Sequence, residues 1–213
     1  MLDVQLPDTK KMIIVLTSEK PIPNEANQIN QLFKADLEIL HLRKPTFTID
    51  GYRSLLDLIE AKYHNRIMTH QFPELTQEYK LRGIHLQEQA RIDLEDALEV
   101  TIKVYTNKGF SVTSSFHSKE DIEACKADFE YVLLSPVFGS ISKAGYEGKG
   151  FDVNDLNHTI IGMGGINETT LQKTYDLGFK GVGILGGIWN TEDPINSFSK
   201  IQEANNIVLK DTI

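Results

Sequence analysis

Short apolar runs alternate with amphipathic segments along almost the whole chain. Such apolar runs occupy 12–17, 36–43, 66–70, 82–86, 110–116 and 129–135, and two more, rich in β-branched residues, lie within 159–188. Between these runs, apolar residues recur at helical spacing, as in the segment 23–35. Strands that alternate regularly with helices predict βαβ units and therefore a parallel sheet.

Eight such strands predict an α/β protein with a (β/α)8 TIM-barrel fold, and we expect residues 1–213 to form one compact domain. The 213 residues allow about 27 for each of eight units, fewer than the ~250-residue barrel average provides, so short loops are expected. A doubly wound open sheet is the alternative. The segment 93–105 stays open, because its acidic start favours a helix and its end, VTIKVY, favours a strand.

Composition and charge indicate which kinds of binding partner to expect. The chain is 40% hydrophobic and 24% charged, with no apolar run near the ~18 residues that span a bilayer. Its N-terminus lacks the basic-then-apolar order of a signal peptide, and a single cysteine, Cys125, suits a reducing compartment. The net charge of −8 comes without a basic stripe. We therefore expect a cytoplasmic protein that binds neither membrane nor nucleic acid; a homo-oligomer stays open.

Two glycine pairs end the last two predicted strands. They are Gly164-Gly165 and Gly186-Gly187, and an amphipathic segment separates them. Glycines at the carboxyl end of a strand let backbone N–H groups approach an anion, and paired loops after strands seven and eight form the recurrent phosphate site of this barrel. The alternative is two tight turns that need glycine only for backbone geometry.

Polar residues gather at the ends of the middle strands. They are His41, Arg43, His70, His85, Ser115 and His117. Because only histidine titrates unaided near neutrality, all four histidines are acid/base candidates. His41 comes first, since period-two alternation places it on one face with Arg43, Ile39 and Leu37. His85 as an interior residue and His70 as a rim residue are the alternatives. A three-histidine zinc or iron site is another, but no carboxylate accompanies it and we expect no metal.

The longest irregular segment, 136–150, follows the sixth strand and carries two hydroxyls before a lysine: Ser140, Ser142 and Lys143. This composition suits a loop that closes over an anionic substrate. Arg43 and Lys44 at the end of the second strand supply further positive charge for such an anion. An ordinary solvated loop is the alternative.

Five segments, in one order, carry a family resemblance. They are HLRKP (41–45), GIHLQEQ (83–89), SSFHSKED (114–121), YVLLSPVFGSISK (131–143) and IIGMGGI (160–166). They resemble motifs of the thiamine phosphate synthase/TenI family, and the resemblance runs over about residues 12–205. The family fold is a (β/α)8 barrel, in agreement with the prediction above.

The resemblance implies a phosphorylated thiazole as the small-molecule partner. Contacts to the thiazole phosphate map onto Ser140, Ser142, Gly164, Gly165 and Gly186, with Leu185 as a backbone neighbour. Contacts to the diphosphate of a second, pyrimidine substrate map onto Arg43, Ser115 and Lys143. In the synthase the two substrates condense to thiamine phosphate, and Mg²⁺ binds the departing diphosphate.

The chain departs from the synthase pattern where metal and charge matter most. The family lysine falls on Pro45, the Asn-Asp pair falls on Thr69-His70, and the second metal-binding aspartate falls on Ala90. Mg²⁺ prefers carboxylate oxygens, so its binding here would need another acid such as Glu88. We therefore expect no cofactor, except that Mg²⁺ would be needed if the protein catalyses the synthase reaction.

The segment 143–150 resembles the TenI branch, which includes thiazole tautomerases that need no metal. Their catalytic histidine falls on Pro136, so another histidine would have to transfer the proton. The resemblance slightly favours a thiazole tautomerase over the synthase reaction. A non-catalytic thiazole phosphate sensor or carrier, and a barrel isomerase acting on another phosphate ester, are the alternatives.

Overall fold

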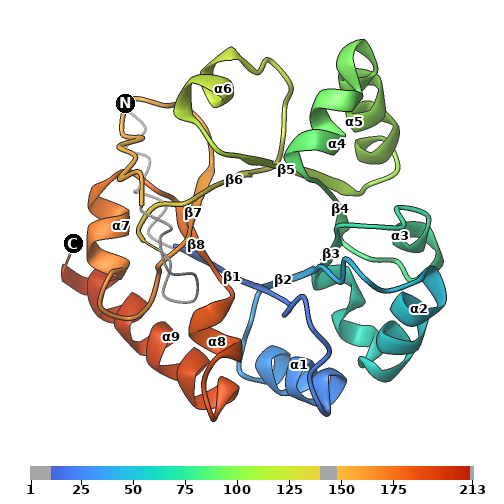
Figure 1. Ribbon diagram of the computed structural model, residues 1–213, viewed down its shortest axis with the longest axis horizontal. Coiled ribbons are helices and arrows are strands. Elements are labelled where there is room, and N and C mark those ends of the chain that lie inside the picture. Colours follow the sequence, from blue (N-terminus) through green and yellow to red (C-terminus); the bar gives the residue numbers. More distant parts are fainter. Residues whose placement is uncertain (1–10, 140–147, 212–213) are drawn as a thin grey trace, which may run out of the picture.

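Eight parallel strands close into a barrel in the order β1 to β8, with β8 paired to β1 (Figure 1). The computed structural model describes residues 11–139 and 148–211. The strands are β1 (Met12–Leu16), β2 (Ile39–Leu42), β3 (Ile67–Thr69), β4 (Gly83–Leu86), β5 (Ser111–Phe116), β6 (Val132–Leu134), β7 (Ile160–Met163) and β8 (Gly181–Ile184). The predicted (β/α)8 barrel is confirmed, and the open-sheet alternative is wrong.

Helices connect the strands and surround the barrel (Figure 1). They are α1 (Glu25–Lys34), α2 (Ile49–Leu58), α3 (Leu75–Glu78), α4 (Glu88–Asp93), α5 (Leu98–Thr106), α6 (Lys119–Ala124), α7 (Leu171–Asp176), α8 (Gly186–Trp189) and α9 (Pro194–Asp211), with 3₁₀ turns η1 (Ala61–Arg66) and η2 (Glu95–Ala97). None of the described helices is both long and apolar enough to cross a bilayer.

Side-chain alternation along each strand divides the core into two layers. Leu40 and Leu42 of β2 face outward, where they belong to the large apolar cluster between barrel and helices. Ile39 faces inward and packs with Ile14 and Leu16 of β1. The same alternation turns His41 into the barrel, where it stacks edge-on against His85. On β2, therefore, only the odd-numbered residues place their side chains inside the barrel.

The barrel interior is apolar on one side and polar on the other. Its apolar side is made by Ile14, Leu16, Ile39, Met68, Leu133 and Ile161, with the ring of Tyr131. Its polar side lies around β4 and β5, where His85 and Thr113 are buried and Ser115 is half-buried. Buried polar groups are stable only when hydrogen bonded, so this side must carry an internal network.

Three local predictions need adjustment. The ambiguous segment 93–105 is helical, because only Ile102 of α5 is buried and the β-branched residues beside it remain on the solvent side. The helix expected over 49–63 ends at Leu58, and after extended backbone at Ile59 the chain forms the separate 3₁₀ turn η1. Leu37, expected beside His41 on the inward face, precedes β2 and packs in the outer layer instead.

Candidate functional site

The carboxyl ends of the strands bring most of the predicted site residues to one end of the barrel. Those that the structure describes are His41, Arg43, Lys44, His70, His85, Ser115, His117, Gly164, Gly165, Leu185 and Gly186. Ser140, Ser142 and Lys143 lie outside the described residues, as does most of the segment that resembles the TenI loop.

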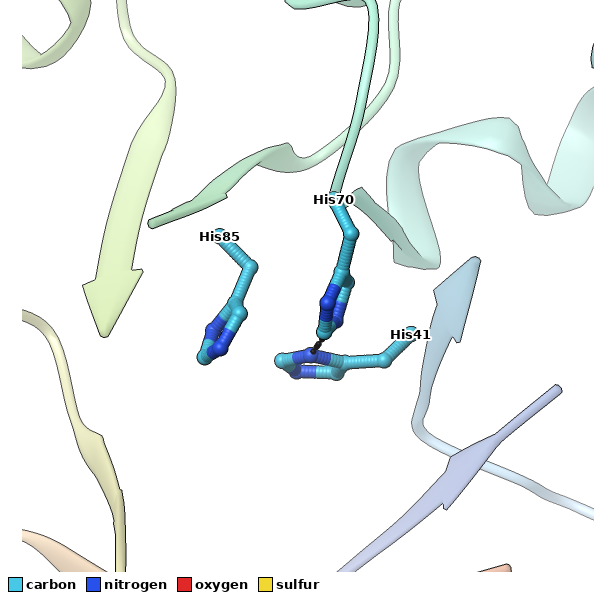
Figure 2. A group of neighbouring side chains, drawn as sticks. All are labelled: His41, His70 and His85. Carbon is cyan, nitrogen blue, oxygen red and sulfur yellow. Dashed lines mark hydrogen bonds between the residues drawn. The ribbon is translucent and has the colours of Figure 1, made fainter. Parts of the chain in front are cut away.

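Three of the four predicted histidines form one cluster (Figure 2). The Nδ1 atom of His41 lies 2.9 Å from the Nε2 atom of His70, and the Nε2 atom of His41 lies 2.7 Å from the Tyr131 hydroxyl. Both ring nitrogens of His41 are thus occupied, and its side chain is fully buried. Any proton that His41 exchanges must pass through His70 or Tyr131.

His85 completes the cluster from β4. Its Nδ1 atom lies 2.8 Å from the Thr113 hydroxyl and its Nε2 atom 2.6 Å from the Ser115 hydroxyl. The imidazoles of His70 and His85 stack with ring centroids 4.2 Å apart. The Ser115 hydroxyl, which we predicted to contact substrate, is therefore engaged with His85.

Burial keeps these imidazoles neutral. Desolvation, followed by the charge of His85, holds the pKa of His41 and His70 well below the usual value. Desolvation, with the positive charge of Arg43 as a second cause, lowers the pKa of His85 to about 3. Because a neutral imidazole both donates and accepts a hydrogen bond, the cluster can pass a proton by exchange of tautomers but stores none near neutrality.

His117, the fourth predicted histidine, is not part of this cluster. Its ring is exposed, and its Nδ1 atom lies 3.0 Å from the Ser135 carbonyl oxygen and 3.2 Å from the Ser135 hydroxyl. Lys149 donates to the His117 carbonyl oxygen at 2.8 Å. His117 thus joins the end of β5 to the two ends of the loop after β6.

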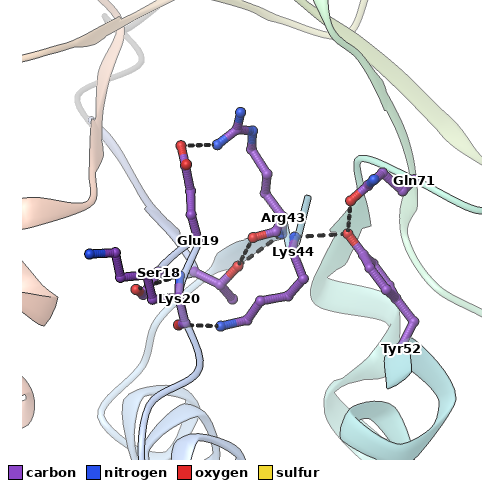
Figure 3. Close-up of polar contacts among 8 residues, drawn as sticks. Ser18, Glu19, Lys20, Arg43, Lys44, Tyr52 and Gln71 are labelled. Atoms are coloured by element: carbon purple, nitrogen blue, oxygen red, sulfur yellow. Dashed lines mark hydrogen bonds and ion pairs between the residues drawn. The ribbon is translucent and has the colours of Figure 1, made fainter. Parts of the chain in front are cut away.

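Arg43 and Lys44 extend in opposite directions from the end of β2 (Figure 3). Arg43 continues the inward parity of His41, is about one-quarter exposed, and pairs with Glu19 after β1. The Lys44 ammonium is fully buried, 2.5 Å from the Glu25 carboxylate of α1 and 3.1 Å from the Lys20 carbonyl oxygen. Arg43 is therefore placed to meet an anion, whereas the charge of Lys44 is already paired outside the barrel.

The glycine pair after β7 is packed against the chain that follows β6. Val137 donates to the Met163 carbonyl oxygen at 2.7 Å, and Phe138 donates to that of Gly164 at 3.1 Å. Gly164 and Gly165 have φ values of 96° and 66°, and a Cβ on Gly165 would lie 2.4 Å from the Gly139 carbonyl oxygen. Backbone geometry and packing alone therefore require glycine here, whether or not the turn also binds phosphate.

The second pair begins helix α8 directly after β8. Leu185 is its N-terminal cap residue, and Ile188 and Trp189 both donate to the Leu185 carbonyl oxygen, at 3.1 and 3.0 Å. The first N–H groups of a helix have no partner within it, so the turn at Gly186 offers donors toward the barrel end. Both glycine pairs thus occupy the predicted positions.

The residues that the structure describes do not fit Mg²⁺, the metal that the family resemblance implies. In the described part of the chain, the group of metal-ligating side chains that comes together consists of histidines alone. Glu19 is paired with Arg43, Glu88 lies 3.9 Å from Arg91, and Ala90 is exposed. Mg²⁺ requires oxygen ligands and usually a carboxylate, so we derive no step through it.

Sequence reasoning missed two polar members of the interior network. Thr113 is the register partner of His85 in the neighbouring strand, and Tyr131 precedes β6. Alternation along β5 from Ser115 would have placed Thr113 on the inner face. Tyr131 carried no local signal, because it stood in an otherwise apolar run and its hydroxyl meets His41 across the barrel.

These features define a (β/α)8-barrel protein with an internal imidazole network under a cationic, glycine-lined carboxyl end. The family model described as thiamine monophosphate synthase (TMP-TENI) matches residues 12–188. The chain belongs to this family, which confirms the predicted resemblance and, at that level, an enzyme of thiamine biosynthesis.

Individual relatives agree with this membership. A crystal structure of thiamine phosphate pyrophosphorylase from Bacteroides thetaiotaomicron is 30% identical, with a TM-score of 0.73 over 92% of this chain and 98% of that one. The thiamine-phosphate synthase of Dictyoglomus turgidum is 21% identical over 81% of this chain and 79% of its own length. A 3-hexulose-6-phosphate synthase structure, 14% identical with a TM-score of 0.65 over 92% of this chain and 99% of that one, shows the shared fold alone.

Proposed function

We propose that this protein is a thiamine phosphate synthase: it joins a thiazole phosphate to a pyrimidine methyl diphosphate and releases diphosphate. In this reaction the thiazole nitrogen forms a bond to the pyrimidine methylene carbon as the bond from that carbon to the diphosphate oxygen breaks. The names of the similar proteins from Bacteroides and Dictyoglomus support this reaction over tautomerisation, against the preference that the TenI-like loop suggested.

The observation that carries the proposal is the joint position of Arg43 and the glycine turns at one barrel end. Arg43 can pair with diphosphate oxygens in two-point fashion if it leaves Glu19. The turns at Gly164, Gly165 and Gly186 can present backbone N–H groups to the phosphate of the thiazole. Ser140, Ser142 and Lys143 remain proposed contacts to the two anions, and Leu185 remains a backbone neighbour.

A second candidate, thiazole tautomerisation, is favoured by one specific observation. Hydrogen bonds join His41 to Tyr131 on one side and to His70 on the other. These three groups can pass a proton along without a change in net charge. A tautomerase needs only a proton donor and acceptor and no metal. In this candidate His70 exchanges the proton with substrate, and His41 acts through it.

One assay separates these candidates. Purified protein is incubated with both synthase substrates, with and without Mg²⁺, and thiamine phosphate is measured after oxidation to its fluorescent product. In parallel, the thiazole carboxylate phosphate tautomers are followed by NMR. Product in the first assay, reduced by Arg43→Ala, supports the synthase. Isomerisation alone overturns it in favour of tautomerisation, and binding without either turnover leaves a carrier.

The proposed cellular location and small-molecule partner are those that the sequence predicts. A reducing, cytoplasmic location is consistent with Cys125, which forms no disulfide. The phosphorylated thiazole is the proposed small-molecule partner.

A further inference from the structure

His41, His70 and His85 offer three imidazole nitrogens at one point inside the barrel. One ligand atom from each lies within 4.8 Å of the other two, and in Figure 2 the His41 ring lies across the ends of the stacked His70 and His85 rings. The three residues come from β2, the end of β3 and β4, which are adjacent strands of one closed sheet. Ligands on such rigid elements are held in place more firmly than ligands on loops.

We propose that these three histidines bind one divalent transition-metal ion, with Zn²⁺ as the best match, and leave a fourth position for an oxygen ligand. Three imidazoles and an open position suit zinc and other borderline ions, whereas Mg²⁺ selects oxygen. The site goes beyond the synthase reaction and stands without it, since it is argued from the imidazoles alone.

The distances require only a small adjustment. Zn–N bonds of about 2.0–2.1 Å in a tetrahedron place ligand nitrogens about 3.3 Å apart. The Nδ1 atom of His41 and the Nε2 atom of His70, now 2.9 Å apart, would separate by a few tenths of an ångström. The His85 nitrogen, within 4.8 Å of both, would approach by about 1.5 Å at most, which a ring rotation supplies.

The surrounding hydroxyls already support metal-bound imidazoles. A histidine that binds metal through one nitrogen normally donates a hydrogen bond from the other. The Nε2 atom of His41 has the Tyr131 hydroxyl at 2.7 Å for this purpose. His85 has Thr113 on one nitrogen and Ser115 on the other, so a metal bound through one nitrogen would replace one of these hydrogen bonds and the remaining hydroxyl would orient the ring.

One nitrogen of the cluster lacks a hydrogen-bond partner. The Nδ1 atom of His70 is buried and has no hydrogen-bond partner among the described residues. An unsatisfied buried nitrogen costs free energy, so such atoms call for an unrecorded partner. With the metal on Nε2, this nitrogen becomes the N–H donor of the metal-bound ring and still calls for an acceptor, such as a bound water.

Arg43, two residues after His41 and of the same inward parity, brings positive charge toward this site. The positive charge of Arg43 reaches both His85 and His70, and Glu19 offsets part of it. A dipositive ion with a guanidinium in its surroundings favours an anionic fourth ligand, and a phosphate or diphosphate oxygen fits that description. Inorganic diphosphate is therefore the probe for this position.

The test measures metal binding directly on the full chain, expressed without a histidine tag and stripped with chelator. Competition with a chromophoric chelator should give one Zn²⁺ per chain with submicromolar affinity. Co²⁺ should give the intense visible bands of a four-coordinate site, and diphosphate should shift them. X-ray absorption of the Zn²⁺ form should show imidazole scattering from three ligands.

Variants assign the site. His70→Ala should weaken Zn²⁺ binding at least 100-fold, and His70→Cys, which restores a ligand, should recover most of it. His158→Ala, at an exposed histidine before β7, is the matched control and should bind like the parent. Absence of stoichiometric binding by the parent chain, six-coordinate Co²⁺ spectra, or equal affinity in His70→Ala and the parent would each overturn the proposal. None of these readouts depends on turnover, so failure of the synthase reaction would leave them unaffected.

Discussion

The Lys44 ammonium and the Glu25 carboxylate form a buried ion pair, 2.5 Å apart, that joins the end of β2 to helix α1. Burial lowers the pKa of Lys44 and raises the pKa of Glu25, whereas the ion pair opposes both shifts. The Lys44 backbone N–H also donates to the Tyr52 hydroxyl at 2.9 Å. Lys44 therefore has a structural role that explains its position without a substrate.

Glu25→Gln should destabilise the protein strongly. It leaves the Lys44 charge buried without a counter-charge, and loss of one partner of such a pair typically costs about 3–5 kcal/mol. Urea unfolding would measure this loss. The double variant Glu25→Leu with Lys44→Met should recover most of the stability, because it removes both buried charges.

The exposed pair of Lys34 and Glu60 provides the control. Lys34→Met should change the free energy of unfolding by less than about 1 kcal/mol. If the double variant at Lys44 and Glu25 folds normally but loses affinity for phosphate esters, Lys44 contacts substrate after all, as the sequence suggested.

Arg43→Lys should weaken binding of the diphosphate substrate more than binding of the thiazole phosphate. A lysine keeps the charge but loses the planar, two-point contact, so we expect KM for the diphosphate to rise about 10-fold, equivalent to about 1.4 kcal/mol. Steady-state kinetics with each substrate varied in turn would show it. Arg53→Lys, on the outer surface of α2 where Asp50 and Glu78 hold its guanidinium, is the matched control.

Glu19→Gln should have the opposite effect, because it releases Arg43 from its ion pair. We expect KM for the diphosphate to fall by a small factor, with stability nearly unchanged. An increase in KM would mean that Glu19 positions Arg43 for the substrate instead of competing with it.

Most of the fold could be predicted from the hydrophobic periodicity, because eight repeats of one strand-and-helix unit are compatible with few topologies. It also placed His41 and Arg43 on one inward face of β2. The same rule, applied one residue further, puts Lys44 on the outer face with Leu42; its pairing with Glu25 became visible only in three dimensions, since α1 precedes the strand. Proximity to Arg43 in the sequence therefore did not reveal that the Lys44 side chain extends to the outer face of the barrel.

The histidine cluster could be predicted only in part. Strand ends predicted that His41, His70 and His85 would share one end of the barrel, but the depth of each ring depends on register and on neighbouring side-chain volume. Tyr131 closes the network from the opposite side of the barrel, 90 residues from His41. No local pattern encodes a contact of that sequence separation.

The buried imidazoles should make the metal-free protein sensitive to mild acid. Their pKa values are lowered in the folded state, so between the unfolded value of about 6.5 and the folded value the unfolded chain binds more protons. Stability is therefore fully present above pH 6.5 and is lost as the pH falls toward the folded values, with His85 at about 3. Each such histidine contributes a slope of up to about 1.4 kcal/mol per pH unit.

Urea unfolding from pH 7.5 to 5, in the presence of chelator, would measure this slope. His85→Gln keeps a side chain able to bond Thr113 and Ser115. It should reduce the slope by the contribution of one histidine, up to about 1.4 kcal/mol per pH unit. His158→Gln, at an exposed histidine, should leave it as in the parent protein. An unchanged slope in His85→Gln would mean that His85 is already protonated in the folded state.

Alanine substitution at Gly165 should separate the backbone role of the glycine turn from its proposed phosphate role. Gly165 combines a φ of 66° with an added Cβ only 2.4 Å from the Gly139 carbonyl oxygen, so the neighbouring segment must move. Gly109 has a φ of 82° but nothing within 4 Å of the added Cβ, and Gly109→Ala should cost about 1–2 kcal/mol from backbone strain alone. Gly165→Ala should cost more, and should also weaken binding of a thiazole phosphate at least 10-fold in calorimetric titration at a temperature where both variants are folded. If Gly165→Ala loses stability but binds the phosphate ester as tightly as Gly109→Ala, the glycine serves packing only, and the phosphate contacts must come from elsewhere at the barrel end.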